Sequence, residues 1–325
     1  MRVFVTGGSG FIGGALVRRL RLEGHEVRVL VRSPRAEALV AEAGAIPVSG
    51  DVSQPGPWQN EVSAGDAVVH AAAMVTDWGP RKEFFRVNVG GTRNVLDAMK
   101  RWNGHFIHVS SIAVHGFRPG VYTETSPVSP GRHPYCSSKA AAEALVVSSV
   151  GEGLKASAVR ISGVYGPGDP HFATRFLDYA ETGRVFIVGP GDQPSKLIYI
   201  DDVVEAFMAI LRRPCEPGAR YLLNDPAVPN VLSMVRLAME ALEISVPVRP
   251  VPEWLAYAVA LWQEGRARLT GSHPQLTRYA VRAMGHRCFF SPEGTSRRLG
   301  WSPRMNAREG VEKTISWYRK SRPAG

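Results

Sequence analysis

The first pattern in this sequence that could do chemistry is a tyrosine and a lysine four residues apart. On a helix, Tyr135 and Lys139 would share one face, about one turn from each other. A phenol has an ordinary pKa of about 10, and a nearby ammonium lowers it by favouring the ionised form. Such a phenol can exchange a proton with an alcohol oxygen, while a hydroxyl such as that of Ser111 holds the same oxygen. The pair alone is a weak signal, because many surface helices carry it by chance.

A glycine-rich turn follows the first predicted strand, which covers 2–6. Gly7, Gly10 and Gly13 lead into a predicted amphipathic helix, with Phe11 and Ile12 at its start. The order of strand, glycine-rich turn and helix predicts a dinucleotide-binding turn. Gly7 permits the tight turn, Gly10 lets a pyrophosphate approach, and Gly13 lets the helix pack closely. The N–H groups at the helix N-terminus then face the phosphates.

The second predicted strand, 26–31, distinguishes between two cofactors. An acidic residue near its end would hold the ribose 2′-hydroxyl of NAD. The strand instead runs into Arg32, whose guanidinium suits the 2′-phosphate of NADP through a charge-assisted hydrogen bond. The sequence therefore favours NADP, with NAD as the alternative.

Predicted strands and helices alternate through the first half of the chain. Further strands are expected at 45–49, 67–70, 105–110, 156–161 and 196–200, and helices at 35–43, 81–101 and from 135 onward. This alternation predicts an α/β fold with a Rossmann-type, doubly wound parallel sheet. We expect a dinucleotide-binding domain over 1–165, to which 195–225 returns. A smaller mixed C-terminal substrate-binding lobe would comprise 166–194 and 226–325.

The bulk composition excludes several classes of protein. The 325 residues carry a net charge of +10, but no zinc-finger spacing or basic run with interleaved aromatics indicates a nucleic-acid partner. The three cysteines, Cys136, Cys215 and Cys288, are scattered and predict neither a disulfide framework nor a metal site. They suit a reducing compartment, and the first residues already form a predicted strand rather than a signal peptide. We therefore expect a cytoplasmic protein without a metal.

Together these segments resemble the extended short-chain dehydrogenase/reductase family, within the NAD-dependent epimerase/dehydratase superfamily. The matching motifs occur in family order, at family spacing, over essentially the whole chain. They are Thr6-Gly-Gly-Ser-Gly-Phe-Ile-Gly13, Gly50-Asp51, His70-Ala-Ala-Ala73, Asn88-Val-Gly-Gly-Thr92, Val109-Ser-Ser111, Tyr135-Cys-Ser-Ser-Lys139, Arg160-Ile-Ser-Gly-Val-Tyr-Gly166 and Tyr199-Ile-Asp-Asp-Val203.

The resemblance implies a role for each matching residue. Tyr135 corresponds to the general acid/base, Lys139 to the residue that lowers the tyrosine pKa and binds the nicotinamide ribose, and Ser111 to the residue that orients the reacting oxygen. The remaining implied contacts lie at the cofactor. Asp51 and Val52 correspond to adenine contacts, Ala71, Ala72 and Ala73 to the backbone that lines the cofactor, and Asn88 to a structural, cofactor-proximal asparagine. A homodimer formed through the helices that contain Asn88 and Tyr135 is also implied.

Within the family, the sequence is most similar to the 3β-hydroxysteroid dehydrogenase-like branch. Four segments carry this likeness: 77–80, 88–95, 274–279 and 299–303. It implies exchange of hydride between NAD(P) and a secondary alcohol or ketone on a sterol, steroid or other bulky hydrophobic substrate. A 3-keto acid or dihydroflavonol-type reductase, a nucleotide-sugar epimerase/dehydratase and a non-enzymatic NADP-binding redox sensor are the alternatives.

Two positions depart from the family pattern. His115 stands where a tyrosine is frequent, and we expect a packed loop histidine there rather than a second titrating group. Gly163 stands where sugar-nucleotide enzymes usually have an asparagine that touches the substrate diphosphate. Its presence disfavours a nucleotide-sugar substrate.

The stretch 251–262 is almost entirely apolar, but it is too short to span a bilayer. A helix that is apolar all round must be buried or contact something apolar. We therefore expect either a core helix of the small lobe, or a wall or lid over a hydrophobic ligand. The lid could rest on a membrane surface beside Arg266 and Arg268.

Overall fold

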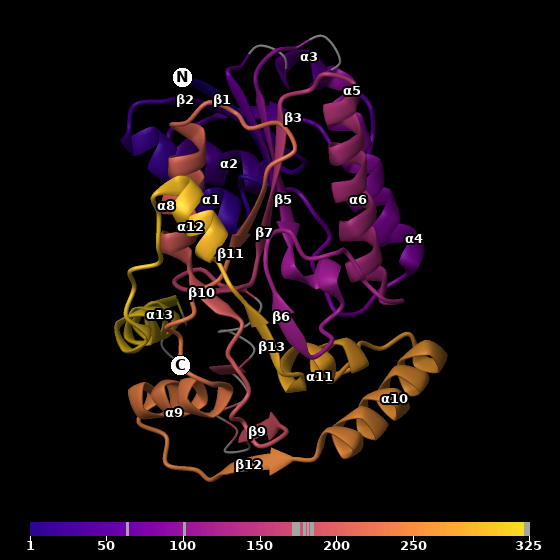
Figure 1. The fold of residues 1–325 in the computed structure, drawn as a ribbon, viewed down its shortest axis with the longest axis vertical. Helices are drawn as coiled ribbons and strands as arrows, with labels where there is room; N and C mark the ends of the chain where they lie inside the picture. The colour runs from indigo at the N-terminus through magenta and orange to yellow at the C-terminus, as the bar shows by residue number, and fades with distance from the viewer. Residues whose placement is uncertain are drawn as a thin grey trace.

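The structure is a computed structural model that describes residues 1–62, 65–99, 102–170, 176–177, 180, 182 and 185–321. The predicted lobe segment 166–194 therefore lies partly outside the described residues. The central feature is a sheet of seven parallel strands in the order β11-β7-β5-β4-β1-β2-β3 (Figure 1). The strands are β1 (Arg2–Thr6), β2 (Glu26–Val31), β3 (Ile46–Ser49), β4 (Ala67–His70), β5 (His105–Ser111), β7 (Ala156–Ile161) and β11 (Arg220–Leu223).

The strand order confirms the predicted doubly wound sheet. From β1 the chain builds outward through β2 and β3, and then from β4 in the opposite direction. The order reverses between β1 and β4. In open α/β sheets, ligands bind outside the carboxyl ends of the strands at this reversal.

Helices cover both faces of the sheet, because successive strand residues point to opposite sides. Val3 and Val5 of β1 pack with Leu16 on one side, whereas Phe4 packs with Val95 on the other. The first face carries α1 (Phe11–Leu22), α2 (Pro34–Glu42), α8 (Ile200–Leu211) and α12 (Glu293–Leu299). The second face carries α3 (Gln59–Val62), α5 (Gly91–Ala98) and α6 (Pro134–Gly151).

The helix predicted over 81–101 is confirmed as a helical segment over 81–98, but it contains a π-helical turn that the sequence analysis did not predict. The segment consists of α4 (Arg81–Phe84), a π-helical turn η1 (Phe85–Gly90) and α5, and its last two predicted positions lie outside the described residues. A π-helical turn inserts an extra residue into the helical ladder and often marks a functional region. Asn88 lies within this turn and uses its side chain to bind the backbone at Met74.

The remaining elements form the smaller lobe and its connections. They include α9 (Val231–Leu242), α10 (Glu253–Thr270), α11 (Arg278–Gly285), α13 (Ala307–Ser321) and the 3₁₀ turn η2 (Ile112–His115). Three parallel strand pairs are β8 (Gly163–Tyr165) with β10 (Leu197–Tyr199), β9 (Val185–Val188) with β12 (Val248–Val251), and β6 (Gly120–Tyr122) with β13 (Cys288–Phe290). β11 and α8 lie with the central sheet, while the division into two domains at the predicted boundaries remains a prediction.

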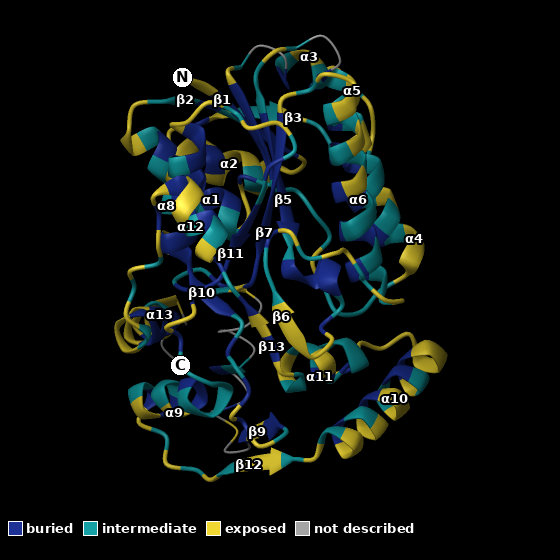
Figure 2. Cartoon of the chain, in the orientation of Figure 1, coloured by how far each residue is buried: buried dark blue, intermediate teal, exposed yellow. Residues whose placement is uncertain are grey.

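The apolar stretch 251–262 is not a core helix, so that alternative is wrong. It forms the first half of α10, at the outer edge of the lobe (Figure 2). The small residues Ala256 and Ala260 are buried against Val188 and Val281. The large side chains point outward instead: Trp254 is 72% exposed and Trp262 is 64% exposed.

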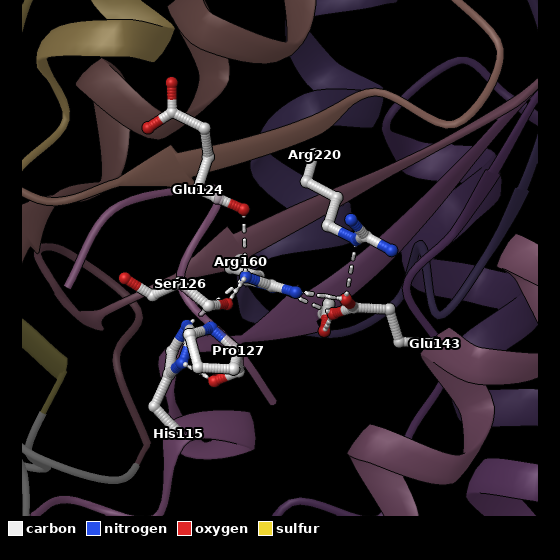
Figure 3. A network of polar contacts seen from close by, with 8 residues as sticks. His115, Glu124, Ser126, Pro127, Glu143, Arg160 and Arg220 are labelled. Carbon is white, nitrogen blue, oxygen red and sulfur yellow. Dashed lines mark hydrogen bonds and ion pairs between the residues drawn. The ribbon is translucent and has the colours of Figure 1, made fainter. Parts of the chain in front are cut away.

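A buried ion pair fixes α6 against the sheet (Figure 3). Arg160 on β7 donates from Nη2 to the Glu143 carboxylate at 2.6 Å, and Ser110 donates to the same carboxylate at 2.6 Å. Both members of the ion pair are buried. Burial alone would raise the pKa of Glu143, but Arg160, Ser110 and Arg220 outweigh it and hold the pKa below its ordinary value.

The other end of the Arg160 guanidinium holds the loop after η2. Its Nη1 donates to the carbonyl oxygen of Glu124 at 3.2 Å and to Nε2 of His115 at 3.3 Å. His115 in turn donates from Nδ1 to the carbonyl oxygen of Pro127 at 3.0 Å. Burial and the adjacent Arg160 lower the pKa of His115 to about 4, so the ring is neutral. The expected packed loop histidine is confirmed.

We predict that Arg160→Met lowers the free energy of unfolding by about 3 kcal/mol, because it leaves the buried Glu143 carboxylate unpaired. The check is urea unfolding at neutral pH. Glu143→Met in the Arg160→Met background should recover part of the loss. The pair's contribution should disappear as the pH falls through the lowered pKa of Glu143.

Glu23→Gln is the matched control, because Glu23 pairs with Arg19 and Arg212 nearer the surface. Its cost should stay below about 1 kcal/mol. A loss for Arg160→Met no larger than that of the control would contradict the assignment.

Candidate active site

A cavity of about 770 Å³ opens at the carboxyl ends of the central strands. Its lining combines the loops after the sheet strands with residues from the lobe. It contains nearly every residue that the sequence analysis selected: Gly7, Gly10, Phe11, Ile12, Gly13, Arg32, Asp51, Val52, Ala71, Ala72, Ala73, Ser111, Tyr135 and Lys139. The exception is Asn88.

The glycine-rich turn leaves room for a ligand where side chains would otherwise stand. Gly7 has a φ of +74°, and a Cβ there would lie 2.7 Å from the backbone nitrogen of Ala72. A Cβ on Gly13 would overlap the carbonyl oxygen of Gly7. The first N–H groups of α1 point toward this turn without partners inside the helix. The cradle therefore fits the pyrophosphate of a dinucleotide.

A polar chain behind the cradle holds the segment after β4. Thr92 donates its hydroxyl to the Asn88 carbonyl and so accepts from His70 Nε2 at 3.0 Å. The other ring nitrogen of His70 then accepts from Thr6 at 2.7 Å, and the Thr6 oxygen accepts from the N–H of Ala72 at 3.2 Å. Burial lowers the pKa of His70 to about 3, so the ring stays neutral. This chain fixes the backbone that lines the cavity.

The adenosine end of the cavity holds opposite charges. Asp51 accepts from the N–H and the hydroxyl of Ser53, each at 2.8 Å. Burial alone would raise the pKa of Asp51, but these hydrogen bonds and the charges of Arg32 and Arg86 hold it below its ordinary value. The Arg32 guanidinium is exposed and makes no hydrogen bond among the described residues, so it remains available to a ligand.

Asn88 is not among the residues that line the cavity, and its selection as a cofactor-binding residue remains a prediction. It is buried behind the segment 71–74, where its side chain binds both N–H and C=O of Met74. Its amide also donates to Ser138 at 2.9 Å, one residue before Lys139. Asn88 therefore positions α6 relative to the cofactor-lining segment.

Tyr135 lies where the dinucleotide cradle meets the rest of the cavity. It is buried, and its phenol lies close to the Ser111 hydroxyl. Burial raises the pKa of Tyr135 to about 12, while the Ser111 hydrogen bond opposes the rise. Lys139 is not among the groups that shift this pKa, and the role implied for Lys139 remains a prediction. Desolvation outweighs every favourable contact, and the neutral phenol prevails at neutral pH.

The Lys139 ammonium binds the sheet rather than the phenol. It donates to the carbonyl oxygen of Val109 at 2.6 Å, one turn of α6 after Tyr135. Burial lowers the pKa of Lys139 to about 8, and Glu143, a further turn along, opposes this shift. The three side chains Tyr135, Lys139 and Glu143 thus follow one face of α6. Ser111, Tyr135 and Lys139 all line the cavity.

Sequence reasoning missed the residues that line the other half of the cavity. Most are apolar: Phe117, Phe176, Phe186, Ile187, Val188, Leu197, Met234, Val235, Tyr279, Ala283 and Met284. Tyr279 belongs to a motif that carried the family likeness, and its ring lies 5.9 Å from that of Tyr135. Lys196, just before β10, also lines this half. No spacing in the sequence marked it, because only the pairing of β10 with β8 brings it there.

Gly163 lies in the same half of the cavity and leaves no space for a larger residue. A Cβ there would lie 2.9 Å from both Leu197 Cδ2 and the carbonyl oxygen of Lys196. An asparagine could therefore not occupy this position without moving β10.

Residues 3–223 match the NAD dependent epimerase/dehydratase family. The chain is 31% identical over 335 residues to 4-hydroxy-2-methyl-3-oxo-4-farnesyl-3,4-dihydroquinoline-1-oxide ketoreductase of Stigmatella aurantiaca, covering 100% of this chain and 98% of the relative. It is 28% identical over 338 residues to a 3 beta-hydroxysteroid dehydrogenase/Delta 5→4-isomerase of Mycobacterium tuberculosis, covering 98% and 90%.

A solved structure of MoeE5 in complex with UDP-glucuronic acid and NAD superposes with a TM-score of 0.79. It is 25% identical and covers 99% of this chain and 100% of that chain. The doubly wound sheet, the glycine-rich turn and these relatives all indicate the same family. The chain belongs to the NAD dependent epimerase/dehydratase family of extended short-chain dehydrogenases/reductases, whose relatives act on CH–OH or keto groups with NAD(P).

Proposed function

We propose that the protein interconverts a secondary alcohol and a ketone on a bulky hydrophobic substrate, such as a sterol, a steroid or another lipid-like 3-hydroxy or 3-keto compound. The observation that carries this proposal is the position of Tyr135. Its phenol, close to the Ser111 hydroxyl, stands between a cradle that fits a dinucleotide and a half-cavity lined mainly by apolar side chains. An apolar lining with few polar groups is typical of sites for hydrophobic small molecules.

The chain's own residues perform the proton transfer. The glycine-rich turn, Asp51 and the Ala71–Ala73 backbone would hold NAD(P), which would supply or accept the hydride. The Ser111 hydroxyl holds the substrate oxygen, and Tyr135 donates a proton to that oxygen or removes one from it. A pKa of about 12 keeps the phenol protonated at neutral pH, which is the form that ketone reduction requires.

The crowded Gly163 counts against the nucleotide-sugar alternative. An asparagine that would contact a substrate diphosphate has no room beside Leu197. The apolar side chains on the same half of the cavity would also desolvate a diphosphate without pairing it. A net change in NAD(P)H during turnover separates a reductase from an epimerase, because an epimerase returns its hydride.

We retain the homodimer implied by the family as part of the proposal.

We predict that Tyr135→Phe retains cofactor binding and loses at least about a hundredfold in turnover, because the proton donor is removed. The assay follows NADPH oxidation with a panel of 3-ketosteroids and long-chain 3-oxo compounds. Tyr257→Phe on α10 is the control, since Tyr257 does not line the cavity. Turnover by Tyr135→Phe close to the wild-type rate would defeat the assignment.

We further propose that NADP is preferred over NAD, because Arg32 is free to bind a 2′-phosphate at the adenosine end. Arg32→Asp should reduce the ratio of NADP to NAD affinity by about tenfold or more, a difference of about 1.4 kcal/mol or more. Fluorescence titration with both cofactors measures the ratio. Arg35→Asp is the control, because Arg35 lies three residues after Arg32 and does not line the cavity. Equal losses for NAD and NADP in Arg32→Asp would argue against the preference.

We also propose that the outer face of α10 rests on an anionic lipid surface. Trp254, Trp262 and Leu269 are exposed on this face, and the Arg266 guanidinium lies 5.4 Å from the Trp262 ring centre. Residues 245–291 carry six arginines against two glutamates, so the surrounding charge complements anionic headgroups. Tryptophan with arginine is typical of membrane interfaces. In the described part of the chain, no helix has the length and apolarity to cross a bilayer.

We predict that the wild type floats with phosphatidylglycerol-containing vesicles, whereas Trp254→Ser with Trp262→Ser does not. The control is Leu22→Ser, which removes an equally exposed apolar residue from α1. Light scattering accompanies the flotation assay. A double variant that still floats, or a change of molecular mass that shows α10 to be an interface between two copies, would refute the lipid contact.

A further inference from the structure

A lone cation stands in the apolar half of the cavity. Lys196 lines the cavity immediately before β10, among Phe117, Leu197 and Tyr279. Its ammonium makes no hydrogen bond or ion pair with the described residues. The Cys288 thiol is the group whose charge acts on its pKa. Burial lowers the pKa of Lys196 below its ordinary value. An unpaired charge in such surroundings is costly unless something pairs with it.

Two contacts place the lysine at the reacting end of the cavity rather than at the adenosine end. The Lys196 carbonyl oxygen accepts from the N–H of Gly163, two residues after Ile161, and Ile161 is the strand partner of Ser111. The Cys288 neighbour belongs to a buried cluster that also contains Phe117 and Tyr135. Lys196 therefore approaches the site from β10 while Tyr135 approaches it from α6.

Lys196 is only partly buried, and it is one of the residues that line the cavity. The acidic residues of the cavity lining do not neutralise it. Asp51 pairs with Ser53 at the adenosine end, and Asp169 follows the turn that begins at Gly166, near Phe11. Because no acidic side chain among the described residues pairs with Lys196, an anionic ligand in the cavity would supply its partner.

We propose that Lys196 binds an anionic group of the substrate, a carboxylate, so that the substrate is an amphiphilic oxo acid with an apolar body. This inference rests on the proposed function, because it assigns the second anchor of the same substrate. The carbonyl group would lie at Ser111 and Tyr135, the carboxylate at Lys196, and the apolar body along the residues of the lobe. A neutral sterol would leave Lys196 unpaired, so the inference narrows the substrate class to acids.

The test measures binding separately from turnover. NADP-saturated protein is titrated by calorimetry with octanoate and with octanamide, its neutral analogue of similar shape. The wild type should bind octanoate about tenfold to a hundredfold more tightly than octanamide, as expected for a hydrogen bond to a charged group. Lys196→Met should bind both equally, with the octanamide affinity unchanged. Lys196→Arg should retain the preference.

Lys155→Met is the matched control, because it removes one lysine at an exposed position outside the cavity. Lys196→Gln replaces Lys196→Met if the latter folds poorly. A wild type that does not distinguish the two ligands, or a Lys196→Met variant that still prefers octanoate, overturns the inference.

A kinetic comparison separates this inference from the proposed function. The wild type is assayed with 3-oxooctanoate and its methyl ester, and we expect a higher kcat/KM for the acid that disappears in Lys196→Met. If the ester is reduced as well as the acid, the reductase function stands and the role of Lys196 fails. If the protein binds octanoate through Lys196 but reduces neither compound, the role of Lys196 stands and the reductase function fails.

Discussion

One face of α6 fixes the geometry of the whole site. Tyr135, Lys139 and Glu143 follow each other at intervals of four residues, and each is tied to a different part of the sheet. Glu143 meets Arg160 of β7, Lys139 meets the carbonyl oxygen of Val109, and Tyr135 meets Ser111. Because these contacts are buried, none is replaced by water at low cost. A shift of α6 along its axis would break all three contacts together. Tyr135, Lys139 and Ser111 therefore keep their spacing as long as α6 stays packed against the sheet.

The cavity joins two environments that suit different parts of one reaction. Around the glycine-rich turn, backbone N–H groups and the charges of Arg32 and Asp51 suit phosphates and a ribose. Beyond Tyr135 the lining is mainly apolar, and water is a poor competitor for hydrogen bonds there. The high pKa of Tyr135 follows from this second environment. Desolvation keeps the phenol protonated, which makes it a proton donor to a ketone.

Local sequence features predicted the sheet well, and they selected residues for the cofactor that line one cavity in the structure. Short β-branched runs bounded by glycines gave strands such as 26–31 and 156–161 with the bounds that the structure has. Features that depend on distant parts of the chain were less predictable. The exposure of Trp254 depends on which side of α10 packs on Val281, and an all-round apolar pattern does not specify that side. Likewise, the sign of the pKa shift at Tyr135 depends on burial rather than on the spacing to Lys139.

The outward side chains of α10 have a consequence for how this chain tolerates mutation. Ala256 and Ala260 attach the helix to the lobe, whereas Trp254 and Trp262 contribute little to internal packing. Polar substitutions at the two tryptophans would therefore scarcely affect folding. Packing inside the chain therefore does not require large apolar residues at these two positions, and only contacts made outside the described chain would do so.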